Sequence, residues 1–297
     1  MFGYILNLLI LVSISGILAG SLNFIIGYAG IYSMAHAAFF GIAAYTGALV
    51  ALHVSTSLLV AIPLAMLLCA LLSLVISLPS LRVRGEYFVV ASLGLQMIAF
   101  TVFSEWKSVT GGLGGITGIP IATLFGFPLR SLEAFLAVSL GCLAFVTAVI
   151  YLLARTSFGR NLKAIRDNEV AAESQGIAVR RVKLAVYGVA AFGAGLAGAL
   201  YFVGNLRISP DAAFSVNWSA FAIFMVVIGG IGRIEGPLVG ALIFWALNKF
   251  FSDYGSWYLM GLGLLAIGVT MFFKQGLWGW LQQRHGWVLF PTRRTLK

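Results

Sequence analysis

Charged residues are scarce in this sequence: they make up 9% of the 297 residues, whereas hydrophobic residues make up 61%. Soluble globular domains carry roughly 25% charged residues and about 45–50% apolar residues. A water-soluble fold of this composition would expose far more apolar surface than soluble proteins tolerate. The shortage of charge therefore excludes an ordinary soluble domain, and it makes a lipid bilayer the natural solvent for the chain.

Nucleotide-binding motifs are also missing. A P-loop needs a Gly-Lys pair followed by Ser or Thr, because its backbone amides and its lysine hold the phosphates. The lysines of this chain instead follow Trp106, Leu162, Val182, Asn248, Phe273 and Leu296. One Gly-x-Gly-x-x-Gly run, residues 193–198, lies inside an apolar segment with no strand before it, so it indicates close helix packing rather than a dinucleotide site. The chain is therefore not expected to bind ATP through a P-loop.

Side chains that could carry chemistry are few and scattered. Most acidic residues lie in expected loops or at the ends of apolar segments: Glu86, Glu105, Glu133, Asp211, Glu235 and Asp253. Ion-coupled carriers commonly bury a carboxylate within a span, so this distribution weakens a proton-relay mechanism. Cys69 and Cys142 lie inside apolar runs and are expected to be packing residues. We see no catalytic triad, carboxylate pair or metal-ligand cluster, and we expect the chain to be no enzyme and to bind no metal or cofactor.

Hydropathy predicts an all-α polytopic membrane protein that forms a single transmembrane domain over residues 1–297. A span needs ~20 apolar residues, so this length allows roughly eight to ten spans. Nine are expected, some of them interrupted by glycine: 4–26, 35–53, 58–80, 87–104, 131–153, 184–204, 215–232, 236–251 and 256–273. The first is expected to be a retained span, because no basic region or cleavage site accompanies it.

The Lys and Arg positions predict how the chain crosses the membrane. If residues 154–183 are cytoplasmic, that side also holds most of the basic residues: Arg82, Arg84, Arg155, Arg160, Lys163, Arg166, Arg180, Arg181, Lys183, Arg233, Lys274, Arg284, Arg293, Arg294 and Lys297. The other side holds Lys107, Arg130, Arg207 and Lys249. The positive-inside rule then places the N-terminus outside and the C-terminus in the cytoplasm. The longest outer loop is 105–130, and its Gly-rich part, 111–118, is expected to be either a docking and gating element or a flexible connector.

The expected cytoplasmic loop 154–183 is a polar segment within a largely hydrophobic protein. Its residues 160–177 predict a short amphipathic helix, with Leu162 and Ile165 on one face. A solvated loop that obeys the positive-inside rule would explain the basic residues alone. It would not explain the small residues between acids in 171–176 (AAESQG), which are typical of a helix that lies in a partner's groove.

A short motif occurs twice in the chain. Ile26–Gly30 (IGYAG) and Ile228–Gly232 (IGGIG) share the pattern Ile-Gly-x-x-Gly, each between two apolar runs. Glycine-interrupted helices in matching positions often line a transporter's substrate path. Chance is the alternative for so short a match. His36, which follows the first motif, is either a structural residue or a substrate contact. The predicted path residues are Gly27, Tyr28, Gly30, His36, Phe39, Tyr45, Gly229 and Gly232.

Four segments in order carry a resemblance to a known family. They are 27–45 (GYAGIYSMAHAAFFGIAAY), 81–88 (LRVRGEYF), 159–177 (GRNLKAIRDNEVAAESQGI, with AGALY at 197–201) and 226–237 (VVIGGIGRIEGP). Over nearly its whole length the chain resembles the LivM-type inner-membrane permease subunits of branched-chain amino acid ABC importers.

This resemblance implies the rest of a transport machine. Such a permease lies in the bacterial inner membrane and pairs with a second related permease, two cytoplasmic ABC ATPases that hold ATP and Mg, and an external substrate-binding protein. It binds no nucleic acid. The expected function is half of a translocation pathway for a small polar solute, with branched-chain or related amino acids first. Urea, amides, other amino acids and aromatic acids are alternative substrates.

The resemblance also assigns the coupling to the ATPase. By analogy with the family's coupling loop, these residues would face the ATPase: Arg166, Asp167, Asn168, Glu169, Ala171, Ala172, Glu173 and Gly176. The chain departs from the common Glu-Ala-Ala-x-x-x-Gly pattern at Val170, where the Glu lies one residue earlier. It also departs at residues 31–35 (IYSMA), beside the expected substrate path, which leaves the exact substrate open.

Two rival functions belong to other classes. A secondary carrier or channel would work without an ATPase and be driven by an ion gradient. A membrane scaffold would transport nothing and use the polar loop to bind another kind of partner.

Overall fold

The computed structural model describes residues 2–80, 86–205, 207–251, 256–273 and 275–285. Its helices are α1 (Phe2–Asn23), α2 (His36–His53), α3 (Leu58–Ser80), α4 (Glu86–Glu105), α5 (Lys107–Thr110), α6 (Leu132–Arg155), α7 (Ser157–Asp167), α8 (Glu169–Ser174), α9 (Val179–Val203), α10 (Pro210–Ala213), α11 (Val216–Gly229), α12 (Gly236–Phe251), α13 (Ser256–Phe272) and α14 (Gly276–His285), with a π-helical turn η1 (Phe24–Ala29) and a 3-10 turn η2 (Gly112–Gly114). The predicted all-α polytopic class is confirmed.

The described helices agree with the predicted range of eight to ten spans. Eight of them are long and apolar enough to cross a membrane, and α12 is a shorter apolar helix of 16 residues. One of these eight candidates, Met260–Arg284, takes in parts of α13 and α14 and also Lys274, which lies outside the described residues. At 1.5 Å per residue, α12 would reach only about 24 Å, less than the ~30 Å hydrocarbon layer.

The bundle has a buried centre and an apolar outer surface. Most residues of helices α1, α2 and α9 are buried, whereas only a minority of the residues of α3, α4 and α6 are buried. Close approach of α2 and α9 depends on Gly198, where an added Cβ would overlap the carbonyl oxygen of Phe40. The glycine run 193–198 therefore serves helix packing. On α13, Met260, Leu264 and Ile267 form an exposed apolar stripe that suits a hydrocarbon environment.

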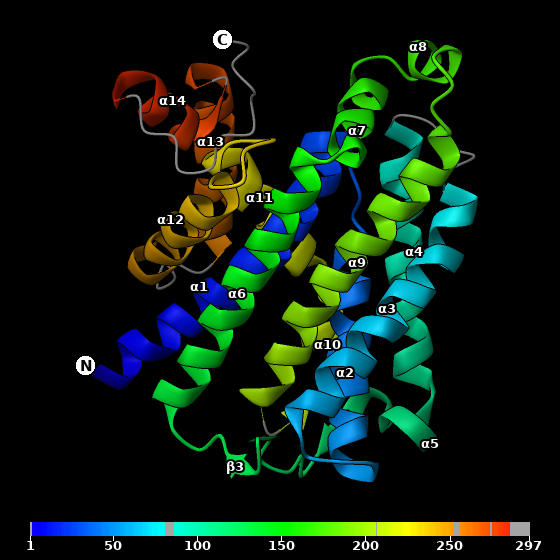
Figure 1. Ribbon diagram of the computed structural model, residues 1–297. Coiled ribbons are helices and arrows are strands. Elements are labelled where there is room, and N and C mark those ends of the chain that lie inside the picture. The colour runs from blue at the N-terminus through cyan, green and yellow to red at the C-terminus, as the bar shows by residue number, and fades with distance from the viewer. Residues whose placement is uncertain (1, 81–85, 206, 252–255, 274, 286–297) are drawn as a thin grey trace.

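The two polar loops lie at opposite ends of the bundle. Figure 1 shows α7, α8 and α14 at one end, and α5 with the strand β3 (Phe127–Pro128) at the other. Lys249 lies over the ring of Tyr4, 3.9 Å from its centroid, so the end of α12 meets the start of α1. The structure thus separates the two groups of basic residues that it describes. Which end faces the cytoplasm stays a prediction, and Arg82, Arg84, Lys274, Arg293, Arg294 and Lys297 lie outside the described residues.

The glycine-rich part of loop 105–130 is folded against the rest of the chain. Strand β1 (Ile116–Thr117) pairs with β4 (Arg207–Ile208), and the Arg207 guanidinium donates to the carbonyl of Gly114 at 3.0 Å. The following strand β2 (Thr123–Leu124) pairs with β3 and is tied to the α2–α3 turn, where the Thr123 amide donates to the Thr56 carbonyl at 2.8 Å. These bonds hold the loop in one place.

The predicted single helix over 160–177 is wrong, because the chain breaks at Asn168. This residue has extended φ and ψ values of −159° and 108°, and its side chain accepts a 3.0 Å hydrogen bond from the Ala171 amide. Asparagine is a strong N-cap residue, so it ends α7 and starts α8. A further difference is the start of α9, which begins at Val179 and not at 184.

Candidate functional site

The polar loop 154–183 folds into a compact protrusion, which we call the α7–α8 knob and define as residues 157–176. Ile165, Ala172 and Val179 form a small apolar cluster that joins α7, α8 and the start of α9. Lys183 donates to the Glu169 carboxylate at 2.8 Å and ties α8 to α9. Figure 1 shows the knob projecting beyond the ends of the neighbouring helices. The loop is therefore an ordered element that can transmit force.

The knob exposes an acidic surface. Among the residues assigned to the ATPase by resemblance, those with exposed positions are Arg166, Asp167, Asn168, Ala171, Glu173 and Gly176. Glu169 is partly covered, and Ala172 is buried on the inner side of α8. Val170, where the sequence departs from the family pattern, is 67% exposed and adds an apolar contact to this surface. Such a mixture of acids and small or apolar side chains is available to a partner.

The first Ile-Gly-x-x-Gly motif forms a wide helical turn at the end of α1. Residues Phe24–Ala29 are π-helical, and Gly30 follows with a left-handed φ of 69°. The Gly30 amide donates to the Ile26 carbonyl at 3.1 Å and closes the turn. Single π-turns within helices occur frequently at functional sites.

The second motif packs directly against the first. A Cβ added to Gly27 would overlap the Cα of Gly232, so the two backbones touch. Asn23 bridges them, because its side chain accepts from the Gly232 amide at 2.8 Å and donates to the Arg233 carbonyl at 2.7 Å. We call this contact of residues 23–30 with 229–233 the glycine junction. The two motifs therefore share a sequence pattern and also lie in contact in the structure.

Helix α7 rests on the glycine junction. Arg166 Nη1 donates to the Gly27 carbonyl oxygen at 2.7 Å. Its Cγ lies 2.7 Å from where a Cβ of Gly30 would be, so only glycine fits there. Lys163 lies 5.1 Å from the centroid of the Tyr28 ring, a cation–π contact. The structure thus joins residues assigned to coupling with residues assigned to the substrate path.

The remaining path residues do not gather at this junction. Tyr45 lies in the middle of α2, where its hydroxyl donates to the Ile208 carbonyl at 3.4 Å and its ring packs on Phe103 and Phe214. His36 begins α2, is fully buried and packs edge-on to Phe39 at 6.1 Å. Neither ring nitrogen of His36 has a hydrogen-bond partner among the described residues. The predicted path is therefore spread along α2.

Sequence reasoning missed one residue of the junction and one residue close to it in the chain. Asn23 lies in an apolar span just before a glycine motif, and a lone buried amide at such a place is a signal for a backbone bridge. Glu235, placed in a loop by the sequence, is 5% exposed at the start of α12. A carboxylate is favoured near a helix N-terminus by the helix dipole. Gly236 and Pro237 after it mark that helix start.

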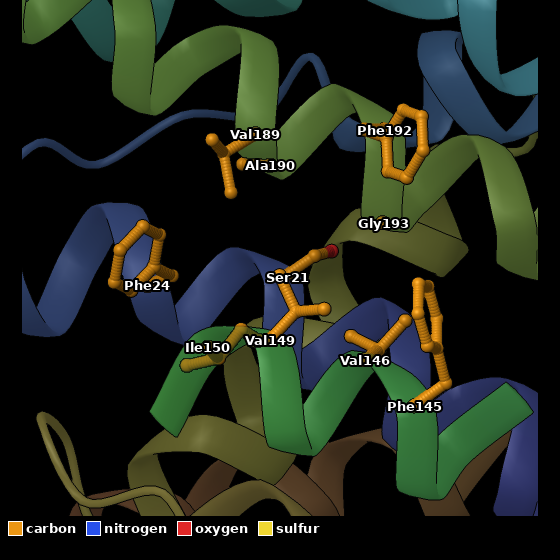
Figure 2. Close-up of a pocket in the computed structure, with 10 residues that line it drawn as sticks. All are labelled: Ser21, Phe24, Phe145, Val146, Val149, Ile150, Val189, Ala190, Phe192 and Gly193. Carbon is orange, nitrogen blue, oxygen red and sulfur yellow. The ribbon is translucent and has the colours of Figure 1, made fainter. Parts of the chain in front are cut away.

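The crevices described on the bundle are small. Figure 2 shows one between α1, α6 and α9, lined by Ser21, Phe24, Val146, Gly193 and other mainly apolar residues. Its volume of about 30 Å³ is one water's share of the liquid, far below the roughly 300–1,000 Å³ of small-molecule pockets. A larger hollow of about 180 Å³ lies at the other end of the bundle, beside Arg130 and Asn205.

Comparison with known proteins gives one family. A family model described as "Branched-chain amino acid transport system / permease component" matches residues 4–275. The chain belongs to this family. It is therefore a membrane permease of the ABC transporter type, as the resemblance predicts.

The relatives of the permease are named for two kinds of substrate. It is 29% identical to the high-affinity branched-chain amino acid transport system permease protein LivM of Escherichia coli over 88% of this chain and 67% of that protein. It is 28% identical to the ribose import permease protein RbsC of Haemophilus influenzae over 90% of this chain and 83% of that protein. A probable LivM of Methanocaldococcus jannaschii is 26% identical over 63% of this chain and 54% of that protein. No solved structure matches the chain. The substrates predicted from the sequence did not include sugars.

Proposed function

We propose that this permease forms half of the translocation pathway of an ATP-driven importer. It would carry a small polar solute, with branched-chain or related amino acids first, delivered by an external binding protein. It would pair with a second related permease in the bacterial inner membrane, with the N-terminus outside. Two ABC ATPases would bind the α7–α8 knob and hold the ATP and Mg, while this chain performs no chemistry. The matched family model and the LivM relative support the amino acid class.

One observation carries the mechanism: the exposed knob is hydrogen-bonded, through Arg166, to the glycine junction. Closure of ATPases beneath the knob would move α7 as a unit, because its apolar cluster and the Lys183–Glu169 pair hold it together. Residues 23–30 and 229–233 would shift with it. Small sliding of packed helices is one of the established ways in which proteins switch conformation.

The rival carrier mechanism has one observation in its favour. Glu235 is a buried carboxylate, the type of group that proton-coupled carriers use. Its place at a helix start beside the junction gives it a structural role as well. Replacing Glu235 with Gln distinguishes the two, because an ATP-driven importer retains uptake that is insensitive to a collapsed ion gradient. A carrier would lose gradient-driven uptake.

The experiment that tests the proposal is gentle purification of the tagged permease from its native membrane. We expect a second permease and two P-loop ATPases in stoichiometric amounts, and the associated binding protein can then be screened with amino acids and with ribose. A chain that runs alone, under conditions in which a control ABC complex stays intact, would contradict the proposal and favour the secondary carrier.

A further inference from the structure

Arg166 faces two ways in the structure. Its Nη1 donates to the Gly27 carbonyl at 2.7 Å, while Nε and Nη2 donate to Asp167 Oδ1 at 3.1 and 3.0 Å. Its side chain is 40% exposed, so a large part of it is turned into the protein. The guanidinium fork is therefore fixed between the tip of α7 and the end of η1.

The Gly27 carbonyl is a suitable target for this contact. It is among the last four carbonyls of a helix, which have no partner within that helix. A cation at a helix C-terminus is also favoured by the helix dipole. Glycine at position 30 leaves the backbone bare beside the Arg166 side chain, so α7 can approach closely enough for the bond. Each feature serves the same contact.

The contact continues beyond Gly27. On its far side Gly27 touches Gly232, and Asn23 holds the Gly232 amide and the Arg233 carbonyl. A hydrogen-bonded and packed series thus runs from α7 through η1 to the loop between α11 and α12. Both glycine motifs are reached from a single side chain of the knob.

We propose that Arg166 is a positioning residue that transmits movement of the α7–α8 knob to the glycine junction, and that it is not an ATPase contact. This inference rests on the proposed function and changes one assignment made by resemblance. The ATPase surface then consists of the outward residues Asp167, Asn168, Val170, Ala171 and Glu173. Arg166 acts one layer deeper, on the Gly27 carbonyl.

The test compares three variants of the complete transporter complex. Arg166→Met keeps the aliphatic stem beside Gly30 and loses every donor. Arg166→Lys keeps one charge that can reach the carbonyl. Arg160→Met is the matched control, because Arg160 is exposed on the same helix and its replacement removes the same charge. Co-purification of the ATPases, ATP hydrolysis, uptake into proteoliposomes and amide hydrogen exchange of residues 24–32 are measured for each.

We expect Arg166→Met to retain the ATPases in the wild-type ratio and to hydrolyse ATP within about twofold of wild type, while uptake falls at least about tenfold. Exchange at 24–32 should rise, Arg166→Lys should recover part of the uptake, and Arg160→Met should match wild type. Loss of ATPases in Arg166→Met would make Arg166 a surface contact, and normal uptake would make the bond dispensable; either result overturns the proposal. A wild-type preparation without ATPases defeats the proposed function, and this role with it.

Discussion

Gly27 and Gly232, one from each Ile-Gly-x-x-Gly motif, meet with no room for a side chain between them. A Cβ on Gly27 would overlap the Cα and the amide nitrogen of Gly232. Gly232 in turn has a φ of 76°, which L side chains rarely adopt. This pair joins the end of α1 to the loop before α12, and the contact is tight enough to transmit small displacements.

The first prediction concerns Gly27. Replacing it with Ala forces the two motifs apart, so uptake should fall by at least about tenfold while the ATPases still co-purify. Gly20→Ala is the control on the same helix, because a Cβ there meets only Ile150 at 3.9 Å, an ordinary contact. Uptake per assembled complex is the measurement. Equal uptake by both variants would show that Gly27 serves only ordinary helix packing.

The second prediction concerns the bridge made by Asn23. Asn23→Ala leaves the partly buried Gly232 amide and Arg233 carbonyl without the bonds that Asn23 now supplies, and each lost hydrogen bond costs about 0.5–1.5 kcal/mol. We expect a lower thermal midpoint for the detergent-solubilised complex. Ser21→Ala is the control, since its hydroxyl donates only to the Leu18 carbonyl of its own helix. Equal midpoints for the two variants would show that water replaces the bridge.

The spans and the two-sided arrangement could be predicted from the sequence, because hydropathy and charge act locally along the chain. The direction of Arg166 could not, since Gly27 lies 139 residues away and only the fold brings them together. The break at Asn168 was available in principle as an N-cap signal, but the apolar period of 160–177 concealed it. The burial of Glu235 depends on how α12 meets the junction, which no local pattern shows.

The third prediction concerns the acidic surface of the knob. Glu173 is exposed on α8, and its side chain forms no hydrogen bond or ion pair with another residue that the structure describes, so Glu173→Arg should preserve the fold. It should weaken ATPase binding, because the charge of a contact surface is reversed. Glu105→Arg is the control: Glu105 is exposed at the other end of the bundle, where an arginine at a helix C-terminus is favourable. ATPase retention during purification is compared between the two variants. Full retention in Glu173→Arg would show that the ATPases bind a surface that does not include Glu173.

The fourth prediction concerns His36. Both ring nitrogens are buried without partners among the described residues, which is unfavourable for a residue that only supports the fold. His36→Leu should therefore leave the thermal midpoint unchanged or raise it, because no hydrogen bond is lost and a desolvated polar group is removed. The melting curve of the complex is the measurement. A clear fall in the midpoint would reveal a partner for His36, such as an ordered water.

The last prediction concerns the outer loop, where two glycines with the same positive φ have different surroundings. Gly115 and Gly118 both have a φ of 71°, but a Cβ on Gly115 would overlap the Ile208 carbonyl, whereas Gly118 has nothing within 4 Å. Gly118→Ala therefore measures only the strain of an L side chain at positive φ, roughly 1–2 kcal/mol. Gly115→Ala adds a clash that separates β1 from β4. If this loop is a docking or gating element, binding-protein-dependent uptake should fall in Gly115→Ala by at least about fivefold relative to Gly118→Ala, with the ATPases still bound. Equal uptake by the two variants would make the β1–β4 pairing a structural connection with no part in docking or gating.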